Sequence, residues 1–188
     1  DSDKKLFLLD AFALIYRAYF AFARNPRVTS KGVDTSAIYG FLLALFDVLQ
    51  KKNPSHVAVV FDLPKPTKRH EIFPEYKANR NANRMTNYAI FQSKDDEREA
   101  LNNQMARLIH YLQCLPISMI CIDGIEADDT IGYLVGKFEK FDATKEVNIM
   151  SADKDFLQLV SDKVRVYSPV KKKIYKPKDV IDELGVSS

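Results

Sequence analysis

Acidic side chains follow four short apolar segments of the sequence, at the point where each segment ends. Asp10 follows Leu6–Leu9, and Asp62 follows Val57–Phe61. The other two segments lead into five further carboxylates: Glu126, Asp128, Asp129, Asp153 and Asp155. Oxygen ligands of this kind select hard cations such as Mg²⁺ or Mn²⁺ over zinc. Two such ions about 4 Å apart can activate a water and stabilise the leaving oxygen of a phosphate ester. If the carboxylates gather in one cleft, the pattern predicts metal-dependent phosphodiester hydrolysis.

Each of these acidic residues also has an ordinary structural explanation. A lone Asp after a strand is usually a turn or cap residue, and acidic side chains in a first helical turn favour the positive end of the helix dipole. Asp153 and Asp155 would in the same way cap a short helix. These explanations must hold at all four segment ends at once, and clustered carboxylates repel one another unless protons or cations neutralise them. We therefore favour a metal site.

Basic residues gather in two stretches, although the net charge is only +3, from 28 basic and 25 acidic residues. The first stretch contains Lys65, Lys68, Arg69, Lys77, Arg80 and Arg84, and the second contains Lys171, Lys172, Lys173, Lys176 and Lys178. Such clusters either contact a phosphate backbone or stay solvated at the surface. Lys77 and Arg80 are candidates for holding a scissile phosphate and offsetting its developing charge.

The elements that must position these side chains alternate between strands and helices. We predict strands at residues 6–9, 57–61, 116–122, 147–150, 164–167 and 173–175, the last one at an edge of the sheet. We predict helices at residues 13–22, 35–49, 100–112, 127–138 and 156–160, with a last one that has Pro177 in its first turn. This alternation favours an α/β fold with a mostly parallel central sheet flanked by helices. In such a sheet, the carboxyl ends of the strands meet at the edge where ligands bind.

Length and composition limit the class of protein. A chain of 188 residues with 46% hydrophobic residues fits one domain with a full apolar core. The 12 Phe and 9 Tyr exclude intrinsic disorder, and no apolar run reaches the ~18 residues of a membrane helix. We interpret Cys114 and Cys121 as reduced core residues of a soluble, cytoplasmic protein. With three scattered His, they cannot form an ordinary zinc site.

Seven motifs along the chain carry a resemblance to a known family. They lie at Leu6–Arg17, Thr35–Phe41, Val59–Asp62, Arg69–Glu71, Tyr76–Arg80, Gly124–Asp129 and Ser151–Asp155. In these motifs and their order, the chain resembles the 5′-nuclease (flap endonuclease) superfamily. This superfamily includes the 5′-3′ exonuclease domain of bacterial DNA polymerase I and the phage 5′-exonucleases. The Gly-Ile-Glu-Ala-Asp-Asp block, followed by Asp-Lys-Asp, is specific.

The resemblance implies a PIN-like fold and a structure-specific 5′ nuclease that uses two Mg²⁺ ions, with Mn²⁺ as a substitute. Its substrates would be DNA with a 5′ flap, a nick or a single-stranded 5′ end, and RNA primers as a further option. The first metal would be held by Asp10, Asp62, Glu126, Asp128 and Asp129, and the second by Asp153 and Asp155. Lys77 and Arg80 would stabilise the phosphate at the foot of a flexible helical arch at about residues 80–99. The remaining DNA contacts would come from Arg17, Arg69, Tyr76 and Arg84.

Two departures from the family pattern qualify these expectations. The arch is Asn-rich, which is closer to the phage enzymes, and the chain ends at Ser188 without the family's Gly-Asp-x-x-Asp-Asn motif. We therefore expect residues 1–188 to form a catalytic domain truncated before the helix-hairpin DNA-binding element, with weak second-metal and duplex binding. We also expect a monomer that is fused to a DNA polymerase or works with one.

Three alternatives remain at this point. The chain could be a catalytically weak or inactive DNA-binding module, or a phosphatase or RNase of the same fold. A haloacid-dehalogenase-type phosphatase fits poorly, because Asp10-Ala-Phe lacks that motif's second Asp.

Overall fold

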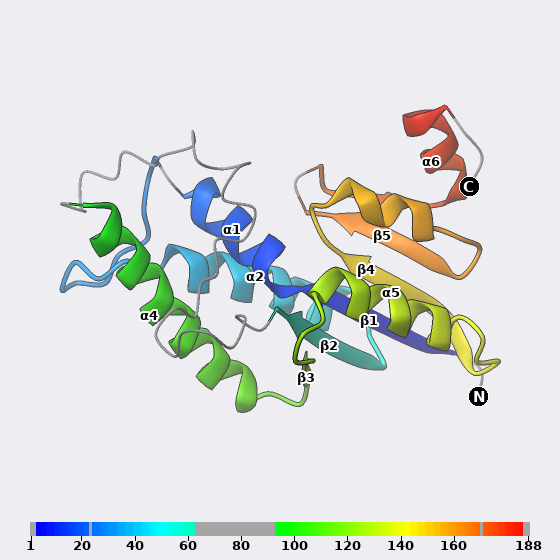
Figure 1. Cartoon of the computed structure of the whole chain (residues 1–188), viewed down its shortest axis with the longest axis horizontal. Helices are drawn as coiled ribbons and strands as arrows, with labels where there is room; N and C mark the ends of the chain where they lie inside the picture. The colour runs from blue at the N-terminus through cyan, green and yellow to red at the C-terminus, as the bar shows by residue number, and fades with distance from the viewer. Residues whose placement is uncertain (1–2, 23, 63–92, 170, 186–188) are drawn as a thin grey trace.

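A six-stranded sheet forms the centre of the computed structural model, which describes residues 3–22, 24–62, 93–169 and 171–185 (Figure 1). The strands are β1 (Lys4–Asp10), β2 (His56–Phe61), β3 (Ser118–Cys121), β4 (Thr144–Met150), β5 (Val164–Ser168) and β6 (Lys173–Tyr175). Their order is β3-β2-β1-β4-β5-β6; β1 to β5 are parallel, and β6 pairs antiparallel with β5. This confirms the predicted mostly parallel α/β sheet with the last strand at an edge.

The central strands are buried on both faces, as their continuous apolar runs predict. In β1, Phe7 and Leu9 belong to one hydrophobic cluster, whereas Leu6 and Leu8 belong to the other. This division follows from the two-residue period of a strand, which sends alternate side chains to opposite faces. A strand packed in this way holds the residue at its end, Asp10, in a fixed position.

Helices cover both faces of the sheet. They are α1 (Ala11–Ala21), α2 (Ser36–Lys51), α4 (Lys94–Gln113), α5 (Ala127–Phe138), the 3₁₀-helix η1 (Lys154–Leu159) and α6 (Pro177–Leu184). Apolar side chains of α1, α2 and α4 pack on one face, and those of α5, η1 and α6 pack on the other. Helices α1 and α2 approach closely at Gly40, where a Cβ atom would collide with the side chain of Ala18.

Helix α4 begins at Lys94, six residues before the predicted start at Ala100. The Ser93 hydroxyl caps it by accepting a hydrogen bond from the Asp96 backbone N–H at 3.1 Å. Acidic residues in the first turn stabilise the same end of the helix. Residues 94–99, which we assigned to the arch, therefore form regular helix. Residues 80–92 of the predicted arch lie outside the described residues, and their structure stays a prediction.

Two predictions about buried side chains are wrong. Cys114 and Cys121 are exposed, because Cys114 is the C-cap of α4 and Cys121 ends the edge strand β3. The apolar spacing of Ile38, Leu42, Leu45, Phe46 and Leu49 predicts that Phe46 lies on the packed face of its helix, but 42% of it is exposed. It lies one residue, or about 100° of helical rotation, beyond the fully buried Leu45. In the described part of the chain, no helix combines the length and apolar character needed to cross a bilayer.

Candidate active site

Asp10 is the most buried carboxylate at the carboxyl edge of the sheet. It ends β1 and is the N-cap residue of α1, and none of its surface is exposed. The Ser151 hydroxyl, from the end of β4, donates a hydrogen bond of 2.9 Å to Asp10 Oδ2. Asp10 Oδ1 is buried and has no hydrogen-bond partner among the described residues. A buried carboxylate oxygen in this state is open to a proton or to a cation.

Burial and two nearby carboxylates change the pKa of Asp10. Burial, and then the negative charges of Asp128 and Asp62, raise this pKa from 3.8 to about 7. The hydrogen bond from Ser151 and the backbone amide of Ala13 act in the opposite direction but do not compensate. Carboxylates from the ends of β1 and β2 and from the first turn of α5 therefore repel one another, and a proton or a cation relieves that repulsion.

Asp62 joins the end of β2 to the start of α5. It is 7% exposed, and its Oδ1 accepts a short hydrogen bond from the backbone N–H of Ala127, the first residue of α5. That bond fixes the helix end whose first turn contains Asp128 and Asp129. Asp128 is half-buried, whereas Asp129 and the N-cap residue Glu126 are exposed.

Asp153 and Asp155 lie beside the same edge, at the start of η1. The Ser151 hydroxyl accepts a hydrogen bond from the Asp153 backbone N–H at 3.0 Å, and Asp153 Oδ1 accepts one from the Asp155 N–H at 2.9 Å. Ser151 thus connects Asp10 to the start of η1. Asp155 lines a groove of about 390 Å³ between α5 and η1, together with Asp128 and Asp129. The helix-cap explanation therefore holds for Asp153, but it does not account for the shared groove.

The predicted convergence of strand ends is found, but the seven carboxylates do not form one closed cage. Among the described residues, no group of three or more His, Cys, Asp or Glu side chains is close enough to enclose a metal ion. The buried Oδ1 atom of Asp10 and an all-carboxylate donor set nevertheless fit a hard divalent cation. The structure thus brings the carboxylates of Asp10, Asp62 and Asp128 near one another at this edge of the sheet.

Of the predicted DNA-contacting residues, only Arg17 is described. It is half-buried in α1 near Tyr167 of β5, and burial lowers the pKa of its guanidinium. Five residues with predicted roles lie outside the described residues: Arg69, Tyr76, Lys77, Arg80 and Arg84.

Two groups that hold the carboxylates were not predicted from the sequence. They are the Ser151 hydroxyl, in a residue that is 1% exposed, and the backbone N–H of Ala127. A serine two residues before Asp153 was a signal for the first group. The second group had no sequence signal, because any residue except proline supplies an N–H.

Comparisons with known proteins point to one family. A family model described as 5′-3′ exonuclease, N-terminal resolvase-like domain, matches residues 5–185. A 5′-3′ exonuclease of Aquifex aeolicus is 37% identical over 183 residues, which are 97% of this chain and 57% of that protein. A DNA polymerase I of Treponema pallidum is 39% identical over 163 residues, which are 87% of this chain and 15% of that protein. The chain thus spans little more than half of the first relative and a small part of the second.

Solved structures show the same fold. The bacteriophage T5 5′-exonuclease with bound zinc ions superimposes with a TM-score of 0.67 at 21% identity, covering 97% of this chain and 62% of that one. A T5 flap endonuclease complex with DNA and metal ions gives a TM-score of 0.64 at 23% identity, covering 97% and 61%. At these identities, the likeness establishes the fold alone.

Proposed function

Since the chain belongs to the 5′-3′ exonuclease family, through its N-terminal resolvase-like domain, we propose that it is the catalytic part of a structure-specific 5′ nuclease. The reaction is hydrolysis of phosphodiesters in DNA with a 5′ flap, a nick or a single-stranded 5′ end. The observation that carries this proposal is the meeting of Asp10, Asp62 and Asp128 at one sheet edge. Names of relatives support it: two are called 5′-3′ exonucleases, and others are called DNA polymerase I.

The carboxylates bind divalent ions, for which we propose Mg²⁺, with Mn²⁺ as a substitute. Asp10, Asp62 and Asp128 hold the first ion, with Glu126 and Asp129 in support, and Asp153 and Asp155 begin the second site. When bound, such ions supply Lewis-acid chemistry and neutralise charge at the phosphate. The chain's own contribution is positional: Ser151 orients Asp10, and the N–H of Ala127 orients Asp62.

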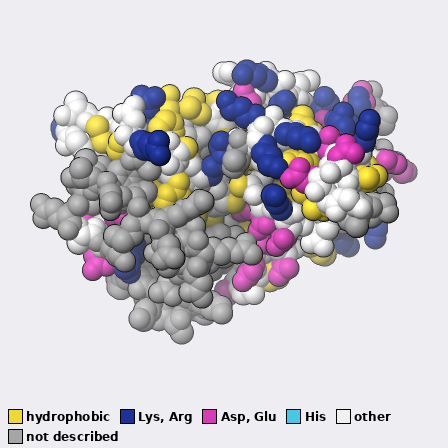
Figure 2. Space-filling view, turned by 90° about the horizontal axis from the view of Figure 1, so that it is seen from above, with side chains coloured by type: hydrophobic (Ala, Val, Ile, Leu, Met, Phe, Trp, Pro, Cys, Tyr) yellow, Lys and Arg dark blue, Asp and Glu magenta, His cyan; other side chains and the backbone are white. Residues whose placement is uncertain are grey.

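Basic side chains bind the substrate in this proposal. Arg17 contacts phosphates, Lys77 and Arg80 stabilise the phosphate that reacts, and Arg69, Tyr76 and Arg84 add contacts to DNA. A nucleic acid could approach along a face where charges of both signs meet. Figure 2 shows acidic side chains near the middle of this face, with Lys and Arg side chains above them and to their right. Action on RNA primers, a monomeric state and cooperation with a polymerase belong to the same proposal.

The direct test is cleavage of a 5′-flap DNA in Mg²⁺ by the wild-type protein and by Asp62→Ala and Asp128→Asn. We expect both variants to lose nearly all activity. Asp142→Ala is the control, because Asp142 is exposed near the opposite edge of the sheet, in the turn before β4. Since Asp62 is buried, circular dichroism must show that its variant folds.

The same experiment separates the enzyme from a DNA-binding module without activity. Such a module would bind the flap DNA and leave it intact at every Mg²⁺ and Mn²⁺ concentration. Full activity in both carboxylate variants would contradict the proposed site. A parallel panel of RNA and small phosphate esters would identify an RNase or phosphatase instead.

A further inference from the structure

A small pocket adjoins the carboxylate edge on the side of β5, β6 and α6. Its volume is about 120 Å³, far below the roughly 300 Å³ at which pockets for drug-sized ligands begin. It shares Ser151 and Asp153 with the edge of the sheet where the carboxylates lie, which we call the acidic edge. The remaining lining residues are Ala152, Lys154, Leu157, Val166, Ser168, Lys171 and Tyr175. A pocket of this size accommodates a phosphate group.

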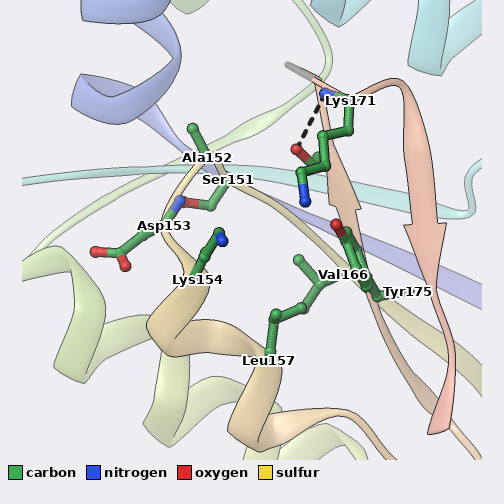
Figure 3. Close-up of a pocket in the computed structure, with 9 residues that line it drawn as sticks. Ser151, Ala152, Asp153, Lys154, Leu157, Val166, Lys171 and Tyr175 are labelled. Carbon is green, nitrogen blue, oxygen red and sulfur yellow. Dashed lines mark hydrogen bonds between the residues drawn. The ribbon is translucent and has the colours of Figure 1, made fainter. Parts of the chain in front are cut away.

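The polar groups of this pocket have the character of an anion site. Figure 3 shows Lys154 and Lys171 extending toward the pocket from opposite sides, whereas the carboxylate of Asp153 points away from them. Lys171 lies next to Tyr175, which is 3% exposed, with its Nζ 6.0 Å from the ring centre. The Ser168 hydroxyl adds a hydrogen-bonding group and accepts from the Lys171 backbone N–H at 3.4 Å.

A carboxylate already bridges the two ammonium groups. Glu183 of α6 lies with Oε1 2.6 Å from Lys171 Nζ and 3.6 Å from Lys154 Nζ. One oxygen atom thus contacts two lysines from different elements, as an oxygen of a bound phosphate would. The hydrogen bond from Lys171 lowers the pKa of Glu183, so this carboxylate is ionised at neutral pH. Because both lysines are well exposed, the bridge can open at little expense of free energy.

We propose that Lys154 and Lys171, with Ser168 and Tyr175, form a phosphate subsite for the nucleic acid, and that Glu183 competes with the phosphate for it. The inference rests on the proposed function, since it places a second phosphate of the substrate strand beside the carboxylates. A terminal phosphate carries more charge and more acceptor oxygens than the Glu183 carboxylate, and an internal phosphodiester, with the same single charge, binds together with the neighbouring phosphates of its strand; either one displaces Glu183 when the strand docks. The same chemistry would accept either an internal phosphodiester or a terminal 5′-phosphate.

The test is DNA binding without cleavage, measured by fluorescence anisotropy in EDTA over a range of salt concentrations. We expect Lys171→Ala to weaken binding of a 5′-flap DNA several-fold and to reduce the salt slope by about one. Glu183→Gln should act in the opposite direction and tighten binding, because it frees both lysines. Lys145→Ala removes a similarly exposed lysine at the start of β4, which pairs with Asp3 at 3.4 Å, and should change nothing.

The subsite predicts opposite changes in DNA affinity for Lys171→Ala and Glu183→Gln, and this distinguishes it from a structural role. If the lysine–glutamate bridge only supported the fold, Lys171→Ala and Glu183→Gln would weaken binding alike or leave it unchanged, and either result refutes the subsite. Comparing 5′-phosphorylated with 5′-hydroxyl DNA identifies the phosphate that binds: a loss confined to phosphorylated DNA indicates the terminal group, and an equal loss indicates an internal one. If the wild-type protein binds and cleaves DNA but Lys171→Ala and Glu183→Gln bind it as Lys145→Ala does, the subsite is refuted and the proposed function stands. A wild-type protein that does neither removes the proposed function as well.

Discussion

Carboxylates in two regions of this molecule are held in opposite ways. At the acidic edge, Asp10 is buried near Asp62 and Asp128, and no Lys or Arg of the described ranges pairs with it; its pKa rises to about 7. In α6, Glu183 lies against Lys171, and Asp179 accepts from the Lys176 backbone N–H at 3.0 Å and pairs with Lys173 at 3.6 Å. The pKa of each of these two carboxyls is lowered by those bonds.

The two regions differ in how their carboxylates affect the stability of the fold. Exposed acids paired with lysines stabilise a fold modestly, and they need no further explanation. Buried carboxylates that repel one another destabilise the folded state until a proton or a cation joins them. Strongly perturbed carboxylates cluster at functional sites, and on this ground we propose that the functional site lies at the sheet edge around Asp10.

The largest expected effect comes from removing the charge of Asp10. We expect Asp10→Asn to lower single-turnover cleavage of a 5′-flap DNA by about 10³-fold or more, the scale on which losing one charge-stabilising group acts in enzymes. The matched variant Asp179→Asn makes the same chemical change in the paired region and should retain nearly full activity. Comparable losses in the two variants would erase the distinction between the regions.

The second prediction concerns the stability of the metal-free protein in EDTA. Because the pKa of Asp10 is raised on folding, the folded state retains a proton that the unfolded chain has already released, and the free energy of unfolding falls as pH rises from about 4 to about 7. A rise from 3.8 to about 7 corresponds to on the order of 4 kcal/mol. Urea unfolding between pH 4.5 and pH 8 measures this fall directly.

Asp10→Asn provides the control for this measurement. The variant has no charge to bury, so its stability relative to wild type should increase with pH across the same window. Divalent ions should raise the stability of the wild-type protein at pH 8 but have little effect on the variant. Parallel pH profiles of the two proteins would show that Asp10 is ionised without penalty.

The parallel sheet and the acidic residues at the carboxyl ends of its strands could be predicted from the sequence. Apolar runs such as Leu6–Leu9 predicted a mostly parallel sheet, because strands buried on both faces have continuous apolar sequences. That four of these strands are neighbours was a condition of the predicted site, and the structure meets it. Helix ends were less predictable. The start of α4 depends on a Ser93 cap and on acidic residues that carry no apolar signal. Cys121 was misplaced because strand order, which no local pattern encodes, puts β3 at the edge.

The depth and the contacts of the candidate site residues could not be predicted from the sequence. That Asp10 is fully buried while Glu126 is exposed depends on how deep each strand end lies in the sheet. The contacts of Ser151 and Ala127 join residues that are 141 and 65 positions away from their partners, and only the folded sheet brings such groups together. The same holds for Glu183, whose two lysine partners come from different elements.

The third prediction tests Ser151, which supports the acidic edge without carrying a charge. Its hydrogen bond lowers the pKa of Asp10, so Ser151→Ala should raise that pKa further and make proton loss harder. We expect about a tenfold higher Mg²⁺ requirement for cleavage at pH 7, the scale of lost outer hydrogen bonds at metal sites. Activity should recover as pH rises to 9. A lower rate at saturating Mg²⁺, with no change in the pH profile, would indicate a packing defect instead.

The smallest expected effects concern the carboxyls of α6 that pair with lysines, and NMR titration of the carboxyl groups in EDTA measures their pKa values. Asp179 and Glu183 should titrate below 3.8 and 4.5, whereas Asp10 should titrate near 7. Because Asp179 is exposed, added salt should move its pKa back toward the ordinary value, and Asp179→Asn should lower the melting temperature slightly at neutral pH but not below its folded pKa. Salt should barely move Asp10, since burial is the main cause of its shift. If Asp10 instead responded to salt as Asp179 does, the acidic edge would be an ordinary solvated surface, and the physical case for a cation site would be lost.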